Sequence, residues 1–250
     1  TSCMELRLDH AQLFFDTGTG FRQASISPLP AIGNRLIDAE NQPHAFVFYS
    51  HFHHDHIQGL AFNPDLFRHS SRIVLASALS SGTELYQQLK RYYSGSYFSL
   101  DILANMPDLQ IRDISAISDM AARRFRLSWI KLRHPGGSYG YRIDAGGKRF
   151  CYLCDNEYHA LQYPELADFT AGADMVVWDG MFTDDEMKNK TGWGHSSIQQ
   201  GITFFQQADI KQLMISHHAP YRHDHDLADF EKNCPDGVIF ARDRLTIIIE

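Results

Sequence analysis

The chain has few cysteines, no long apolar run and no excess of positive charge, and each shortage excludes a class of protein. Four cysteines in 250 residues are too few for a disulfide scaffold, which favours the cytoplasm as the location. No apolar run approaches the roughly 18 residues of a membrane-spanning helix, and no signal peptide opens the chain, so no membrane association is expected. With 23 basic against 30 acidic residues, the net charge of −7 predicts no surface for a long nucleic acid.

Histidine, in contrast, is abundant. The chain contains 14 histidines, and they gather at residues 51–56 and 217–225. A neutral imidazole is the commonest metal ligand among side chains. The histidine count therefore makes a transition-metal site the first hypothesis.

Short apolar segments and helical patterns alternate along the chain, with polar blocks just past the segment ends. The predicted strands lie at 3–8, 12–16, 45–49, 72–76, 125–132, 139–143, 149–153, 175–178, 212–216 and 245–249. The predicted helices lie at 80–93, 196–208 and 226–232. No low-complexity linker separates the halves, so we expect one α/β domain over residues 1–250, with face-to-face sheets covered by helices. Because the chain opens on Thr1 instead of methionine, we also expect an upstream segment.

The sharpest motif is the segment 50–56, which contains the pattern His-x-His-x-Asp-His. On a loop that leaves a strand, His51 and His53 can converge on one metal ion, while Asp55 and His56 turn toward a second. Imidazole and carboxylate ligands suit zinc, with manganese or iron as alternatives. A histidine-rich surface turn without a metal is the competing interpretation.

This pattern resembles the metal signature of the metallo-β-lactamase superfamily, and the resemblance continues over nearly the whole chain. It continues with His134 in the segment 134–141, with Asp155 after an apolar strand, and with His217 after another. The resemblance implies an αββα sandwich of two mixed β-sheets flanked by helices, with a dinuclear metal centre at the rim. By the resemblance, one ion is held by His51, His53 and His134, the other by Asp55, His56 and His217, and Asp155 bridges the two.

Three neighbours of these ligands have less certain roles. His217 is favoured over the adjacent His218 because the family ends this strand on the ligand histidine. His54 lies at a variable position of the motif and is expected to face solvent or support the ligands. Asp16 either hydrogen-bonds a ligand histidine from behind or only caps its own turn.

Two divalent ions with a shared aspartate usually hold a bridging water and lower its pKa, so that hydroxide is available near neutral pH. Such a centre hydrolyses phosphoesters, thioesters, lactones or β-lactams. No cysteine stands among the apparent ligands, which disfavours the β-lactamases that use one. A thioester or lactone hydrolase, of glyoxalase II-like or lactonase-like type, remains the alternative, and a non-catalytic metal-binding or ligand-binding module is a third.

The segment 193–197 discriminates among these reactions, because it resembles the His-Ser-Thr element of ribonuclease Z and related phosphodiesterases. The resemblance implies that His195 contacts the scissile phosphate and protonates the leaving oxygen. A helix that begins near Ser196 would add backbone N–H donors toward an anion. Asp55 joins His195 as a candidate catalytic residue. The competing interpretation makes His195 a neighbour of a helix cap without a chemical role.

The substrate is expected to be a small or cyclic phosphodiester, or another small ester. Ribonuclease Z carries a tRNA-gripping arm, commonly between the third histidine and the bridging aspartate, and the connection from His134 to Asp155 has room only for a hairpin. Together with the net charge, this predicts that no long nucleic acid binds. An aromatic cluster at 92–98 predicts base stacking, a homodimer contact or ordinary packing.

Overall fold

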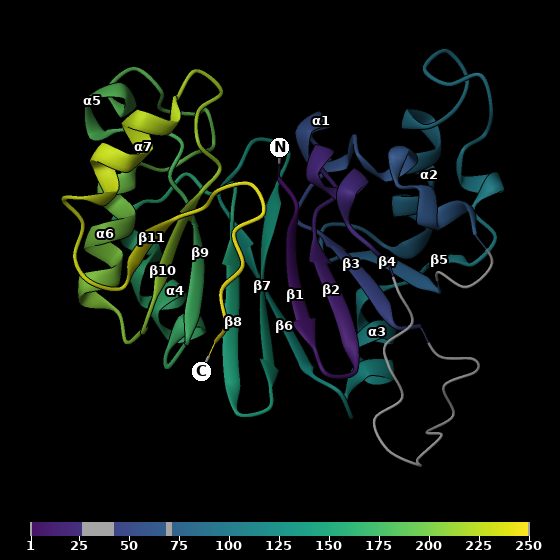
Figure 1. The fold of residues 1–250 in the computed structure, drawn as a ribbon, viewed down its shortest axis with the longest axis horizontal. Coiled ribbons are helices and arrows are strands. Elements are labelled where there is room, and N and C mark those ends of the chain that lie inside the picture. Colours follow the sequence, from purple (N-terminus) through teal and green to yellow (C-terminus); the bar gives the residue numbers. More distant parts are fainter. Residues whose placement is uncertain (1, 27–42, 69–71, 250) are drawn as a thin grey trace. The chain divides into compact units, whose positions relative to one another are not determined.

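The computed structural model describes residues 2–26, 43–68 and 72–249, and the chain divides into two compact units, Thr1–Arg124 and Phe125–Glu250. Each unit is built on one mixed β-sheet flanked by helices (Figure 1). This confirms the α/β class and the two mixed sheets expected from the resemblance. No helix within the described ranges combines the length and the hydrophobicity that crossing a membrane requires.

In the part of the first unit that the structure describes, the sheet has five strands in sequence order. The first two strands are antiparallel and the remaining neighbours are parallel. The three central strands are buried at every position, which explains their continuous apolar runs. The strands are β1 Met4–Leu8, β2 Ala11–Phe15, β3 Ala45–Tyr49, β4 Ile73–Ser77 and β5 Leu109–Ile111.

Outside the sheet, the described residues of the first unit form three α-helices and four 3₁₀ turns. Helix α2 begins as its sequence predicts, because Ser81 accepts a hydrogen bond from the Glu84 amide while the Glu84 carboxylate accepts one from the Ser81 amide. The helices are α1 His54–Ile57, α2 Gly82–Tyr92 and α3 Ile114–Ala121, and the 3₁₀ turns are η1 Thr19–Gln23, η2 Leu60–Phe62, η3 Pro64–Phe67 and η4 Leu103–Asn105.

The sheet of the second unit has six strands, ordered β11-β10-β9-β8-β7-β6. Strands β6 to β8 form an antiparallel meander, and β8 to β11 are parallel neighbours. The strands are β6 Arg126–Leu132, β7 Ser138–Ala145, β8 Lys148–Leu153, β9 Met175–Asp179, β10 Leu213–Ser216 and β11 Val238–Phe240. The helices are η5 Ala160–Gln162, α4 Tyr163–Thr170, α5 Asp184–Met187, α6 Ile198–Gln207 and α7 Asp224–Glu231.

The core of this unit lies between its sheet and α6. The ring of Phe204 stacks on that of Trp178 with centroids 5.1 Å apart, and a Cβ at Gly201 would lie 2.7 Å from the indole. Glycine at this position lets the helix approach β9 closely. The buried strand β9 and its polar end are thereby fixed against α6.

The sequence-based prediction fails at the end of the chain. Residues 245–249 form no strand, and the short strand β11 at Val238–Phe240 completes the sheet instead. The apolar pattern at 245–249 matches that of a strand, but in the structure the place beside β10 is taken by β11. Helices α3 and α4, each eight residues long, were not predicted either.

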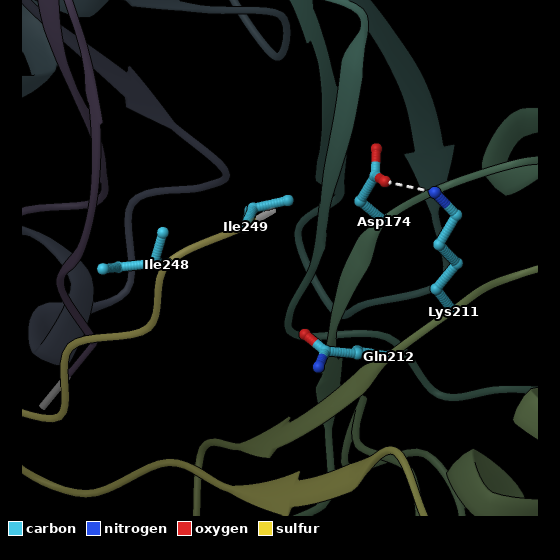
Figure 2. Close-up of a pocket in the computed structure, with 5 residues that line it drawn as sticks. All are labelled: Asp174, Lys211, Gln212, Ile248 and Ile249. Atoms are coloured by element: carbon cyan, nitrogen blue, oxygen red, sulfur yellow. Dashed lines mark hydrogen bonds and ion pairs between the residues drawn. The ribbon is translucent and has the colours of Figure 1, made fainter.

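A cavity of about 300 Å³ lies in the second unit, and none of the residues that line it is a candidate ligand (Figure 2). It is bordered by Lys211 and Asp174, which form an ion pair of 2.7 Å, and by Gln212, Ile248 and Ile249. Asp174 and Gln212 precede the first residues of β9 and β10, whereas the polar blocks follow the last residues of these strands. The cavity therefore belongs to the opposite edge of the sheet.

Candidate metal centre

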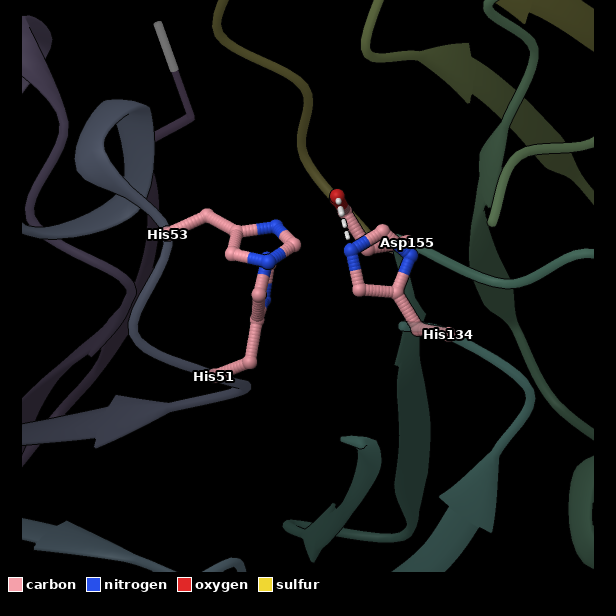
Figure 3. Close-up of side chains that lie close together, drawn as sticks. All are labelled: His51, His53, His134 and Asp155. Atoms are coloured by element: carbon pink, nitrogen blue, oxygen red, sulfur yellow. Dashed lines mark ion pairs between the residues drawn. The ribbon is translucent and has the colours of Figure 1, made fainter. Parts of the chain in front are cut away.

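In the first unit, the histidines of the motif lie against one another. The ring centroid of His51 is 4.4 Å from that of His53 and 4.2 Å from that of His56, and Figure 3 shows the first of these pairs. Strand β3 ends at Tyr49 and delivers His51, while Asp55 and His56 lie on the short helix α1. The Nε2 atom of His56 is 3.3 Å from a carboxylate oxygen of Asp55. This grouping of imidazole and carboxylate donors fits a divalent metal ion.

Asp16 holds two of these imidazoles from behind. It is fully buried and has a left-handed backbone with φ of 62°. Its carboxylate accepts hydrogen bonds from Nδ1 of His56 at 2.8 Å and from the Ser50 hydroxyl at 2.8 Å, and the Ser50 oxygen is 3.0 Å from Nδ1 of His51. Both imidazoles therefore have Nδ1 engaged, which leaves Nε2 as the ligand atom of each.

We expect the variant Asp16→Asn to bind zinc about 10 to 100-fold more weakly than the natural chain, because a partner behind a ligand histidine contributes roughly that factor. Competition with a chromophoric chelator measures the affinity. Asp9→Asn, in an exposed turn, is the matched control and should bind normally. An unchanged affinity in Asp16→Asn would mean that Asp16 only caps its turn.

In the second unit, the carboxylate of Asp155 lies among three imidazoles. Its two oxygens are 3.2 Å from Nε2 of His217, 3.6 Å from Nε2 of His134 and 3.9 Å from Nδ1 of His195. Figure 3 marks the pair of Asp155 with His134. Like Asp16, both Asp155 and His217 adopt left-handed backbones just past a strand end, with φ of 59° and 57°. Non-glycine residues seldom adopt this conformation, and it concentrates at functional sites.

His134 is fixed by the loop that precedes His195. Its Nδ1 donates to the Gly194 carbonyl at 2.7 Å, which leaves Nε2 facing Asp155. The Glu157 carboxylate accepts hydrogen bonds from the amides of Gly192 and Gly194, both shorter than 3.0 Å at Oε2. Gly194 is therefore held through both its amide and its carbonyl.

His195 is paired with a buried aspartate that the sequence did not single out. Nδ1 of His195 donates to Oδ2 of Asp179 at 2.8 Å, and Asp179 has no exposed surface. The second carboxylate oxygen accepts from the Met181 amide at 3.2 Å. The signal available in the sequence was an aspartate directly after the apolar run 175–178. Because this hydrogen bond engages Nδ1, Nε2 of His195 points away from Asp179. Nε2 is therefore the atom that can exchange a proton with a bound molecule.

The structure places the remaining candidates as follows. Helix α6 is capped by Ser197, not Ser196, and the Ser196 hydroxyl donates to the Asn156 carbonyl. Nε2 of His218 donates to the Ala241 carbonyl at 3.0 Å, whereas His217 lies beside Asp155. Burial lowers the pKa of His218, so this side chain is neutral near pH 7. His217 as the ligand therefore stays the prediction that the geometry favours.

Among the described residues, no cysteine belongs to these groups of possible metal donors. Cys151 lies in β8 and Cys154 directly follows this strand, and both are buried. Burial raises the pKa of the Cys151 thiol to about 12, so this thiol is unreactive at neutral pH.

The fold consists of two mixed β-sheets, and histidine and aspartate side chains at the strand ends offer metal donors. These two features together define a metal-dependent hydrolase of the α/β class. A family model described as the beta-lactamase superfamily domain matches residues 12–218. The chain belongs to this superfamily, as its motif pattern predicted.

Among curated proteins, a ribonuclease Z of Thermoplasma acidophilum is 25% identical over 257 residues, which cover 86% of this chain and 79% of that protein. Among solved structures, the short form of human tRNase Z has a TM-score of 0.65 at 16% identity, with 100% of this chain and 92% of that chain covered. A diphosphatase of the PhnP family has a TM-score of 0.67 at 16% identity, with 99% and 84% covered. The two structural similarities show a shared fold.

These relatives correct one expectation. The inference that no long nucleic acid takes part is wrong, because the matched curated relative is a ribonuclease and a structural neighbour is a tRNase. Net charge sums over the whole surface, so a value of −7 does not exclude a local surface that binds RNA. The short connection between His134 and Asp155 excludes an arm only at that position.

Proposed function

We propose that the chain is a metal-dependent phosphodiesterase. The observation that carries this proposal is the pair of His195 and Asp179, whose imidazole is also 3.9 Å from the Asp155 carboxylate. A departing alkoxide needs a proton, and an imidazole held by a buried carboxylate supplies one. A thioester releases a thiolate, which leaves without a proton, so the pair favours a phosphodiester over a thioester. A lactone also releases an alkoxide, so lactone hydrolysis remains the alternative that the substrate panel has to test.

We further propose two divalent ions, zinc first, with manganese or iron as alternatives. Nitrogen and oxygen donors without cysteine fit these metals. When bound, such ions supply Lewis acidity and a nucleophile at neutral pH. The proposed ligands are His51, His53 and His134 for one ion, Asp55, His56 and His217 for the other, and Asp155 for both.

The side chains of the second unit would then complete the reaction. His195 in its imidazolium form places a proton on the leaving oxygen from Nε2, while Nδ1 stays bonded to Asp179. The carboxylate of Asp179 stabilises the imidazolium before the transfer and holds the ring in position after it. Nucleophile attack at phosphorus and protonation of the leaving oxygen together break the ester bond.

The proposed substrate class is a small or cyclic phosphodiester, supported by the β7–β8 connection, which is a plain hairpin with a turn between Ala145 and Lys148. RNA is the second substrate class, favoured by the ribonuclease relatives. The two classes share the bond that is cleaved and differ in the size of the groups on each side of it. A small phosphodiester and an RNA should therefore both be assayed as substrates.

We expect chelator-stripped protein to be inactive and to regain hydrolysis of bis-(p-nitrophenyl) phosphate with zinc or manganese. Metal binding should also raise the free energy of unfolding, by about 2.7 kcal/mol at 100 times the dissociation constant. The metal-loaded protein should also be assayed on a panel of four further substrates: a 3′,5′-cyclic nucleotide, a precursor tRNA with a 3′ extension, an acyl-glutathione and a lactone. Rapid turnover of the last two without phosphodiester cleavage would replace the proposal by a thioester or lactone hydrolase. A metal-loaded protein that cleaves none of the panel would indicate a binding module.

A further inference from the structure

An aromatic patch lies on the surface of the first unit, near the metal-binding motif. Its outer members are Tyr97 and Phe62, whose exposed fractions are 73% and 57%. Tyr92 and Phe98 are half-buried beneath them. The rings of Tyr92 and Tyr97 are nearly parallel, at 17° and 6.3 Å between centroids, and Phe62 lies 6.2 Å from Phe98. Exposed aromatic side chains that gather in one place are typical of interaction sites.

The patch is connected to the motif by the tyrosines at the end of α2. The hydroxyl of Tyr92 and Nδ1 of His54 form a hydrogen bond of 2.5 Å, and His54 stands between His53 and Asp55 in the chain. The buried Tyr93 donates from its hydroxyl to the carbonyl of Ile57, the last residue of α1. Both ends of the motif helix are therefore tied to residues that support the patch.

The loop that carries Tyr97 is closed at its base. The amide of Ile102 donates to the Tyr93 carbonyl at 3.2 Å, and Lys90 forms an ion pair of 3.4 Å with Asp101. Within the loop, the Tyr97 amide donates to the Ser94 carbonyl at 3.3 Å. Tyr97 is thus presented on a bonded loop, with its outer surface open to solvent.

We propose that Tyr97, supported by Tyr92, is a stacking platform for a nucleobase of the substrate. An exposed ring that lies nearly parallel to a second ring is an arrangement that can stack a base. Trp193, an exposed aromatic residue in the second unit, is less suited, because the Lys190 ammonium lies 3.7 Å from its ring centroid. The proposal rests on the phosphodiesterase function and narrows the substrate to a phosphodiester that carries a base.

The kinetic test compares two esters that release the same group, thymidine 5′-(p-nitrophenyl) phosphate and methyl p-nitrophenyl phosphate. Tyr97→Ala should lower kcat/KM about tenfold on the thymidine ester, mainly through KM, and leave the methyl ester unchanged. Tyr97→Phe keeps the ring and should behave like the natural chain. Leu161→Ala removes an even more exposed apolar side chain, 85% exposed, in the second unit and serves as the control. Equal losses on both esters, or no loss on either, overturn the proposal.

A binding measurement separates this proposal from the phosphodiesterase function. Saturation-transfer NMR with adenosine 5′-monophosphate should show transfer to the base protons, and Tyr97→Ala should abolish it. If the protein cleaves no phosphodiester but shows this loss, the platform stands and the catalytic proposal fails. If the protein cleaves phosphodiesters and the transfer is unaffected, the platform fails alone. A third outcome would also overturn the platform. If the natural chain is dimeric, and Tyr97→Ala is monomeric with unchanged NMR transfer, the patch is a contact between two copies of the chain.

Discussion

The variant His195→Ala is expected to lose about 10²- to 10⁴-fold in kcat on a substrate whose leaving group is an alkoxide, such as a cyclic nucleotide. The loss should be much smaller on bis-(p-nitrophenyl) phosphate, because p-nitrophenolate departs without a proton near neutral pH. The reason is the position of the imidazole: Nδ1 is engaged by Asp179, so Nε2 is the atom that exchanges a proton. Parallel assays of the two substrates with the same metal-loaded protein measure this difference.

A second measurement distinguishes proton transfer from metal binding. Asp155, His195 and His217 offer atoms within 4.8 Å of one another, so His195 could itself contact an ion. If His195 only transfers a proton, the metal content per chain stays unchanged in His195→Ala. His225→Ala, which removes an exposed histidine from α7, is the control. Equal losses on both substrates together with a lower metal content would make His195 a metal ligand.

The contiguous part of the candidate site could be predicted from the sequence, because neighbouring residues carry it. His51, His53, Asp55 and His56 follow one strand, and the structure groups their side chains through that local geometry. The sequence also indicated His134, Asp155 and His217 as candidates, because each of them follows an apolar run that predicts a strand. Prediction was possible here because short-range chain geometry decides where these side chains lie.

The supporting contacts could not be predicted, because they join residues far apart in the sequence. Asp179 meets His195, and His134 meets Gly194, only after the strands and loops of the second unit are in place. The chain end shows the same limit in the fold: residues 245–249 match a strand in pattern, but a strand also needs a free partner edge. The wrong prediction that no long nucleic acid binds has a related cause. The net charge gives the sum of the charges but not where they lie on the folded surface.

The glycine before His195 gives the most direct test of these supporting contacts. A Cβ at Gly194 would lie 2.3 Å from Nδ1 of His134 and 2.3 Å from Cδ of Pro135, and the backbone has a φ of 87°. Gly194→Ala should therefore displace His134 and His195 together. We expect a loss of about 2 kcal/mol or more in the free energy of unfolding and a loss of activity of about 100-fold or more.

The chain offers a matched control two residues earlier. Gly192 has a φ of 84° and also donates its amide to Glu157, but a Cβ there meets nothing within 4 Å. Gly192→Ala should show only the cost of a left-handed alanine, about 1 to 2 kcal/mol, with nearly full activity. Denaturant unfolding of the stripped proteins and kcat/KM of the metal-loaded proteins measure both variants. Since the two glycines share backbone conformation and hydrogen-bond partner, equal effects would show that contact with His134 does not position the site, whereas a selective loss in Gly194→Ala would show that it does.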